Sequence, residues 1–473
     1  MNTFKSALIV LLLILSSNVL AKYEYPIENP ITATIMGTPE EFRITQDDLR
    51  HRQPDYVQMP VLNSQFKREI DKEYKISIFP HREIPEVFWY ERGGLKYSIA
   101  QHDSKAPLIF IIAGTGASYR SATVKKLQKI FYQAGYHVVA VSSPTIANFM
   151  YNASTSVMPG NLLEDSQDIY RVMQRIMQKH HTIAVSDYFL TGYSLGASHA
   201  AFVSFIDTQK KAKQEDSFQF KKVLLISPPL SLFSSVDVLD KMFEENIPGG
   251  IDNFNEFFNK FIKKASRFYR DNEELGVGKE FFYEIFRQQP PSEKEMKVMI
   301  GFVFRILSTG MIFGADVFNR LGYIVPRNIV DELTPSTSLT RYSKIAHRIG
   351  FNDYIENLYL PNFEQKTGMT RQQLIDQSSL ESIKDYLLNN TQIGLMHNSD
   401  DPILLPGEID KLKALFPDRA TIYPHGGHLG NIQYKQNVND MLDFFVQGWP
   451  YAAQHRTCGN SSCPEIAFEG GVQ

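Results

Sequence analysis

Short apolar runs alternate with stretches of helical spacing over residues 86–229. Leu108–Ile112 and Val223–Ile226 are almost entirely apolar, which is typical of strands buried on both faces of a parallel sheet. Residues 161–179 instead repeat apolar side chains at helical spacing. The alternation predicts strands at 108–112, 137–141, 188–190 and 223–226, and helices at 120–134, 161–179 and 195–207. Such an order predicts an α/β fold with a doubly wound, mostly parallel sheet.

The alternation stops after residue 229 and resumes near residue 391. Strands are predicted at Ile393–Met396 and Ala420–Tyr423, followed by helices at 407–415 and 433–446. The segment between the two parts, 230–390, is mostly of helical spacing and has no βαβ rhythm. We therefore expect a helical insertion inside the sheet domain.

The N-terminal part is more polar. Residues 22–85 contain scattered prolines and no long periodic run, so we expect an extension that wraps the main domain. Val87–Tyr90 and Leu95–Ile99 flank Glu-Arg-Gly-Gly, which predicts a β-hairpin.

Two apolar features stand out in the insertion. One is a stripe on one helix face after Asp252, formed by Phe254, Phe257, Phe258, Phe261 and Phe268. The other is the run 298–315, which is nearly all apolar except for Arg305. A transmembrane helix would place that arginine in mid-membrane at high cost, so a buried helix is the favoured interpretation.

Composition excludes several function classes. Lys and Arg number 49 against 52 Asp and Glu, and this net charge of −3 gives no support to nucleic-acid binding. A hydrophobic fraction of 43% indicates a globular chain with a substantial core. Two cysteines are too few for a disulfide-rich scaffold or a cysteine-based zinc cluster.

The first residues have the pattern of a signal peptide. Lys5 precedes the apolar segment 7–15, and Val19-Leu20-Ala21 fits cleavage after Ala21. A membrane anchor is the alternative, but the apolar run is short for a bilayer. We therefore expect an exported protein, periplasmic or secreted.

The expected export bears on the state of the two cysteines. Cys458 and Cys463 are separated by Gly-Asn-Ser-Ser, which favours a turn, and an oxidising compartment favours a disulfide between them. A redox-active pair is the alternative.

The main chemical signal is Gly192-Tyr193-Ser194-Leu195-Gly196. A predicted strand precedes it and a predicted helix with small residues follows, which is the setting of a nucleophile elbow. The glycines fit a turn too sharp for side chains around Ser194. A tight strand-to-helix turn with a capping serine is the alternative interpretation.

On these residues the chain resembles the α/β-hydrolase superfamily, whose triad follows the order serine, acid, histidine. The resemblance implies Asp401, directly before Pro402, as the acid, with Asp400 as the alternative. It implies His428, within His-Gly-Gly-His after the last predicted strand, as the base, with His425 as the alternative.

The resemblance also implies an oxyanion hole. One donor would be the backbone N–H of Leu195, and the second would come from Ala-Gly-Thr-Gly after the first buried strand, by position at Thr115. Ala113 departs from the His-Gly opening common in the family. A phosphate-binding loop is the competing interpretation, but the Lys-Ser/Thr ending of a Walker loop is missing there.

The resemblance covers 87–229 and 391–446, and the insertion lies where many family members carry a lid. We expect a signal peptide at 1–21, an N-terminal extension at 22–85, a hydrolase core at 86–229 and 391–450, a helical lid at 230–390 and a C-terminal tail at 451–473.

These features predict a serine hydrolase without metal or organic cofactor, acting on a small apolar acyl substrate. An ester is favoured and an amide or peptide bond is the nearer variant. The lid could also make a peripheral membrane contact. The alternative is a catalytically silent α/β-hydrolase fold used for binding.

Overall fold

An eight-stranded sheet forms the centre of the computed structural model, which describes residues 23–54, 66–260, 263 and 291–447. The strand order is β1-β2-β4-β3-β5-β6-β7-β8. In chain order the strands are β1 (Asp71–Ile76), β2 (Leu95–Ala100), β3 (Ala106–Ile112), β4 (His137–Val141), β5 (Val185–Tyr193), β6 (Lys222–Ile226), β7 (Ile393–Asn398) and β8 (Ala420–Tyr423). Strand β2 runs antiparallel to both of its neighbours, and the pairs from β4 to β8 are parallel.

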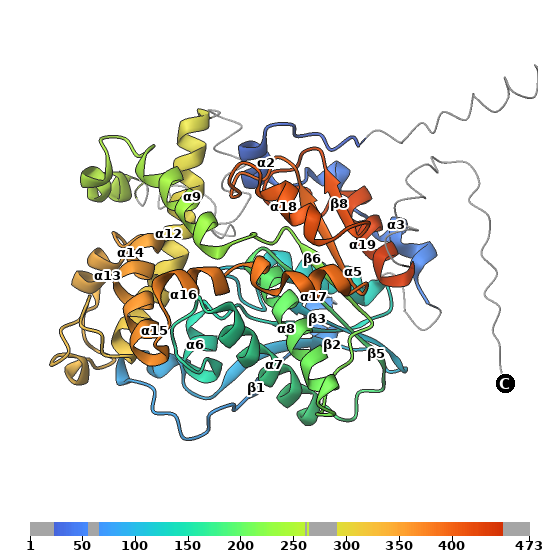
Figure 1. The fold of residues 1–473 in the computed structure, drawn as a ribbon, viewed down its shortest axis with the longest axis horizontal. Helices are drawn as coiled ribbons and strands as arrows, with labels where there is room; N and C mark the ends of the chain where they lie inside the picture. The colour runs from blue at the N-terminus through green and yellow to red at the C-terminus, as the bar shows by residue number, and fades with distance from the viewer. Residues whose placement is uncertain (1–22, 55–65, 261–262, 264–290, 448–473) are drawn as a thin grey trace, which may run out of the picture.

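Helices cover both faces of this sheet (Figure 1). Helices α7 (Leu162–Lys179) and α8 (Leu195–Ala212) pack on one face, and α5 (Ala122–Gln133) and α19 (Lys435–Gln447) on the other. Strand β3 shows why: Leu108, Phe110 and Ile112 join the first core, whereas Ile109 and Ile111 join the second. A strand buried on both faces needs an unbroken apolar run, as the sequence has here.

The strand order, the reversed β2 and the helices on both faces are those of the α/β-hydrolase fold. The predicted fold class is confirmed. Each predicted β/α element between residues 108 and 229 and after residue 391 is present, including α18 (Glu408–Leu415). Parallel neighbours bring the carboxyl ends of β5, β7 and β8 to the same edge, where ligands bind in open α/β sheets.

The predicted β-hairpin is wrong in its first arm. Residues Glu86–Glu91 form a 3₁₀ helix, and β2 pairs with β1 instead. The reason is visible in the burial: Val87 and Phe88 are buried, whereas Trp89 and Tyr90 are exposed. Two consecutive buried residues followed by two exposed ones do not have the alternation of a strand.

The N-terminal residues contain more regular structure than the sequence suggested. They include the short helices α2 (Pro30–Met36) and α3 (Gln46–Leu49), and strand β1 at the edge of the sheet. Strand β1 reads Asp-Lys-Glu-Tyr-Lys-Ile, and most of its side chains are exposed or half-buried. Charged edge strands resist aggregation, but they lack the apolar signal by which strands are recognised.

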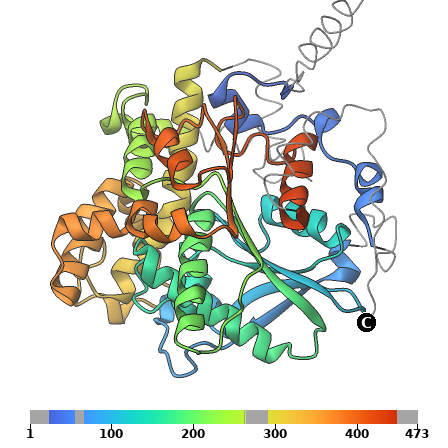
Figure 2. The same ribbon diagram turned by 45° about the vertical axis from the view of Figure 1, so that its right-hand side comes forward.

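The described residues between β6 and β7 are mostly helical, and most of these helices lie together on one side of the sheet in both views (Figure 2). They are α9 (Leu232–Glu244), α12 (Glu293–Phe318), α13 (Thr340–Ala346), α14 (Phe351–Tyr354), α15 (Leu360–Thr367), α16 (Arg371–Gln377) and α17 (Lys384–Asn389). Helix α17 and the turn before it contribute Leu380, Ile383 and Leu387 to the same core as α8. The others belong to further apolar clusters, two of which also include residues outside the insertion, such as Tyr151 and Ile31.

Helix α12 contains the long apolar run. It is the one helix in the described residues that is long and apolar enough to cross a membrane, and 56% of its most apolar window is buried inside the protein. Arg305 is 1% exposed and forms salt bridges of 3.0 Å to Asp240 and 2.6 Å to Glu244, both on α9. The arginine that interrupts the run is therefore neutralised by the helix on which α12 packs.

The phenylalanine stripe is described only in part. Phe254 is buried against Phe243 and Phe302, and Phe257 and Phe258 pack beside it. Phe261 and Phe268 lie outside the described residues.

Candidate active site

Ser194 lies in the one-residue turn between β5 and α8. Its backbone has a φ of 53°, a conformation rarely adopted by residues other than glycine. A Cβ on Gly192 would lie 2.1 Å from the carbonyl oxygen of Gly196, and a Cβ on Gly196 would lie 2.3 Å from that of Ile112. Both glycines are therefore required for the turn to close, and the strain at Ser194 is that of a nucleophile elbow.

Two other predicted residues reach Ser194 from neighbouring strand ends. His428 follows β8, and its Nε2 lies 2.9 Å from Ser194 Oγ. Asp401 follows β7, and its Oδ2 lies 2.8 Å from His428 Nδ1. All three side chains are buried. The structure thus brings the predicted serine, histidine and aspartate into one hydrogen-bonded chain, with the histidine in the middle.

The two alternative residues have other partners. Asp400 accepts hydrogen bonds from the backbone N–H groups of Gly426, at 3.1 Å, and Gly427, at 2.9 Å. His425 donates from Nε2 to the carbonyl oxygen of Tyr25, at 2.9 Å. Asp400 therefore holds the histidine loop from outside, and His425 faces the N-terminal segment.

The charge state of Asp401 is set by its surroundings. Burial by itself opposes ionisation, but the contact with His428 outweighs it and holds the pKa of the carboxyl below its usual value. An ionised Asp401 accepts the Nδ1 proton of His428, which leaves Nε2 free to accept the proton of Ser194.

His397 is a neighbour that sequence reasoning did not single out. Its Nδ1 lies 3.8 Å from Asp401 Oδ2, its Nε2 donates to the carbonyl oxygen of Pro228 at 3.0 Å, and its Nδ1 accepts the N–H of Asn398 at 2.9 Å. Burial lowers the pKa of His397, which favours the neutral form. Its position at the end of β7 gave no signal in the sequence.

Thr34 on α2 is a second residue that the sequence did not reveal. Its Oγ1 accepts the backbone N–H of His428 at 2.8 Å and donates to the carbonyl oxygen of Pro30 at 2.7 Å. The contact joins residues far apart in the chain, so no local pattern could show it. The N-terminal segment thus supports the histidine loop directly.

The two predicted oxyanion donors lie at the same edge of the sheet as Ser194, Thr115 after β3 and Leu195 after β5. Leu195 is the first residue of α8, where an N–H has no partner within the helix. Thr115 borders the same pocket as Ser194, and the next N–H, that of Gly116, donates to Thr145 Oγ1 at 2.8 Å. Their role as donors stays a prediction.

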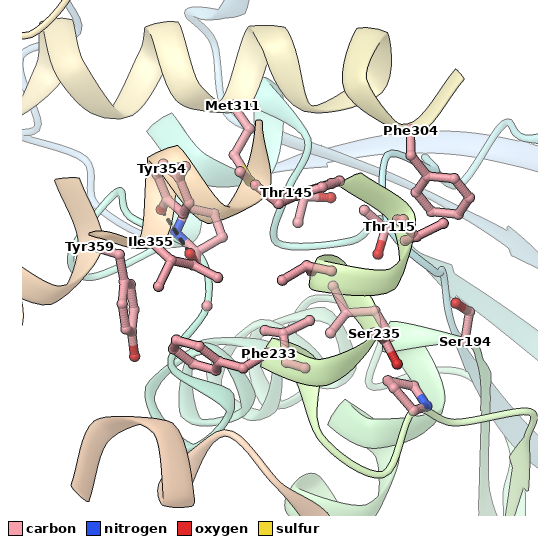
Figure 3. Close-up of a pocket in the computed structure, with 18 of the residues that line it drawn as sticks. Thr115, Thr145, Ser194, Phe233, Ser235, Phe304, Met311, Tyr354, Ile355 and Tyr359 are labelled. Atoms are coloured by element: carbon pink, nitrogen blue, oxygen red, sulfur yellow. Dashed lines mark hydrogen bonds between the residues drawn. The ribbon is translucent and has the colours of Figure 1, made fainter. Parts of the chain in front are cut away.

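A narrow apolar pocket opens beside Ser194 (Figure 3). Its walls come from the insertion helices α9, α12 and α14, the helical turn Ile355–Tyr359, the start of α7 and the loops after β3, β4, β6 and β7. The apolar lining includes Leu232, Phe233, Val236, Leu239, Phe304, Met311, Phe351, Ile355 and Ile403. The free space is about 50 Å³, where a single water needs about 10–15 Å³. A pocket this narrow suits a slender apolar group.

Other predicted features are not addressed by this geometry. Residues 1–21 with the signal-peptide pattern, and Cys458 and Cys463, lie outside the described residues. Within the described ranges, no three His, Cys, Asp or Glu side chains come close enough together to hold a metal ion.

Comparison with known proteins gives structural similarity without sequence similarity. No family profile matches the chain, and no curated protein matches it in sequence. Among solved structures, a hydrolase of Legionella pneumophila has 10% identity over 75% of this chain and 83% of its own, with a TM-score of 0.41. A serine hydrolase of Cycloclasticus zankles has 14% identity over 80% and 99%, with a TM-score of 0.38.

The acylaminoacyl peptidase of Pyrococcus horikoshii has 11% identity over 83% of this chain and 44% of its own, with a TM-score of 0.41. At such distances the fold assignment depends on the strand order and the elbow described above. By fold and by the arrangement of its site, the chain resembles the serine hydrolases of the α/β-hydrolase superfamily.

Proposed function

We propose that the protein is an exported serine hydrolase that cleaves a carboxylic ester with an apolar acyl group through Ser194, His428 and Asp401. The observation that carries the proposal is the 2.9 Å contact between Ser194 Oγ and His428 Nε2 beside an apolar pocket. A serine that only caps a helix has no need of a histidine base, whereas a histidine that acts as a base is oriented by a third group, as His428 is by the buried Asp401.

The roles follow from the contacts. His428 accepts the proton of Ser194 as Oγ attacks the acyl carbonyl carbon, and then gives it to the departing alcohol. Asp401 holds the imidazole in the required tautomer and stabilises the imidazolium. The N–H groups of Leu195 and Thr115 would stabilise the oxyanion of the tetrahedral intermediate. Water then attacks the acyl-enzyme by the same proton transfers in reverse order.

The pocket favours an ester over a peptide. Its lining is mostly apolar side chains, so it offers few partners to the backbone N–H and C=O groups that flank a peptide bond. A slender acyl chain needs no such partners. Export enters this proposal through the N-terminal sequence pattern alone.

The test is labelling with a fluorophosphonate, followed by assays with nitrophenyl esters of increasing acyl length. Ser194→Ala should abolish labelling and reduce ester turnover by about 10⁶, because the triad acts as a unit. The matched control is Ser198→Ala, on the same helix, which should still be labelled. A folded wild-type protein that is neither labelled nor active would support the binding-protein alternative instead.

A further inference from the structure

The pocket beside Ser194 contains an acid that the proposed reaction does not use. Asp165, in the first turn of α7, lines the pocket and is 2% exposed. Its Oδ2 accepts the backbone N–H of Gly160 at 2.9 Å, but its buried Oδ1 has no hydrogen-bond partner. Among the described residues, Asp165 takes part in no salt bridge. A buried carboxyl oxygen without a hydrogen-bond partner is rare in native proteins, so its presence needs an explanation.

A second unpartnered polar atom lines the same pocket. The hydroxyl of Ser235, on α9, is buried and has no hydrogen-bond partner. The stick view shows Ser235 on the side of the pocket nearer Ser194, and Tyr359 on the opposite side (Figure 3). Asp165 accepts the N–H of Gly160, and a Cβ on Gly160 would lie 3.2 Å from the ring of Tyr359, so Asp165 belongs with that far side. The apolar pocket thus has polar atoms without partners at more than one point along it.

The surroundings of Asp165 favour a neutral carboxyl. Burial, and after it the neighbouring carboxylates of Asp168 and Glu164, raise the pKa of Asp165 well above its usual range. A neutral carboxyl has one O–H to donate and can also accept, so its natural partner is an uncharged polar group. A water molecule can satisfy it in the free protein, and a ligand hydroxyl that replaces this water keeps the hydrogen bond.

We propose that the pocket binds an unbranched apolar group that carries an uncharged hydroxyl away from the scissile carbonyl, and that Asp165 is the specificity residue that recognises this hydroxyl. The inference rests on the proposed function, because it assumes that the occupant of the pocket is part of the ester cleaved at Ser194. The narrow pocket selects an unbranched chain, and the unpartnered Oδ1 of Asp165 selects its hydroxyl.

The first experiment compares pairs of nitrophenyl esters as substrates of the wild-type protein. Each pair has the same acyl length, and one member carries a terminal hydroxyl. At one length the hydroxylated ester should have a kcat/KM at least about tenfold higher, because a plain chain leaves Asp165 unpaired. A third series of esters with a terminal amine tests whether the pocket prefers a cation to an uncharged hydroxyl.

Variants then assign the preference to Asp165. Asp165→Leu should lower kcat/KM for the hydroxylated ester to that of the plain ester, whereas Asp165→Asn, which still donates and accepts, should keep most of the preference. Ile355→Leu is the matched control, since it changes the same pocket without a polar atom, and it should leave the ratio unchanged.

The outcomes are distinguishable. If fluorophosphonate labels Ser194 and plain esters are cleaved, but no hydroxylated ester is preferred at any length, the inference is wrong and the proposed function stands. A preference for the amine series would also overturn it. No labelling and no ester cleavage would remove the proposed function and this inference together. The wild-type comparison needs no variant, so it decides the inference even if Asp165→Leu does not fold.

Discussion

Asp400 and Asp401 are adjacent in the sequence but have different partners, so the two acids can be separated by experiment. Asp401→Asn should lower turnover by up to about 10⁴, because the amide offers the wrong partner to His428 Nδ1. Asp400→Asn should cost much less, since Asp400 accepts the N–H groups of Gly426 and Gly427 in the histidine loop, whereas Asp401 faces His428 Nδ1. Steady-state kinetics of both variants on one ester gives the comparison. Equal and small losses would place the acid elsewhere.

The two elbow glycines should tolerate no side chain. Gly196→Ala would put a Cβ 2.3 Å from the carbonyl oxygen of Ile112, a backbone atom that cannot move without shifting β3. We expect loss of labelling at Ser194, or loss of folding, in this variant. Gly310→Ala is the control, because nothing lies within 4 Å of its Cβ position on α12. Thermal unfolding measured beside labelling separates the two causes, and an active Gly196→Ala would contradict the elbow geometry.

Among single residues, sequence reasoning could predict those that lie in a local motif. Ser194 has its two glycines, Asp401 has the following proline and His428 follows a glycine-rich turn. It missed Thr34, because its contact with His428 joins segments far apart in the chain, and it missed His397, four residues before Asp401, because no local motif marks that histidine. Asp165 was missed for a related reason: in the sequence it is one of two acids in an ordinary helix first turn.

Helix α8 contains a buried histidine that should couple stability to pH. Burial lowers the pKa of His199 to about 3, below its value in an unfolded chain. The unfolded state therefore binds the proton first as pH falls, and stability is lost progressively below about pH 6.5. Between about pH 7 and pH 4.5 this residue should contribute a loss of roughly 2–3 kcal/mol.

His199→Gln tests this contribution. Urea unfolding at the two pH values should show a smaller loss of unfolding free energy in the variant than in the wild type. Lys72→Gln, a surface change, is the control and should keep the wild-type loss. An identical loss in His199→Gln and wild type would mean that His199 does not titrate between folded and unfolded states.

The stability of the protein should depend on the charge balance around Arg305, the buried arginine of helix α12. Arg305→Met leaves Asp240 buried without its cation and should destabilise the protein by about 3–5 kcal/mol. Replacing both residues, Arg305→Met with Asp240→Leu, should recover much of the loss, because well-packed apolar pairs often replace buried ion pairs at little cost. Urea midpoints of the single and double variants measure this. A double variant as unstable as the single one would contradict the pairing.

Elements were predictable where their apolar pattern was continuous. The buried strands of the parallel sheet and helices α5, α7, α8 and α19 follow directly from the periodicity. Strand β1 was not predictable, because an edge strand with charged side chains resembles a loop in composition. The 3₁₀ helix at Glu86–Glu91 has the sequence signal of a strand, because its aromatic and β-branched residues favour strands.

At the scale of the whole molecule, the N-terminal segment links parts that are distant in the sequence. Thr34 bonds the backbone of His428, and Ile31 packs in one apolar cluster with Leu239, Met296 and Ile300 of the insertion helices. The histidine loop and the pocket helices therefore share a support, which is the short helix α2.

Thr34→Val tests this support. Valine has nearly the same shape but cannot accept the His428 N–H, so we expect kcat to fall by about tenfold, with a smaller change in KM. Thr34→Ser should restore most of the rate. A drop in KM and kcat together in both variants, or no change in either, would mean that Thr34 does not position the histidine loop.

The shared helix α2 has a consequence for protein engineering. Insertions between β6 and β7 look like exchangeable modules, since both of their ends join the same sheet. Here, however, the insertion also contacts α2, which in turn holds the histidine loop. A chimera that receives a foreign insertion without a matching α2 should lose rate at Ser194 even when both parts fold. Transplanting residues 23–38 together with the insertion should avoid that loss.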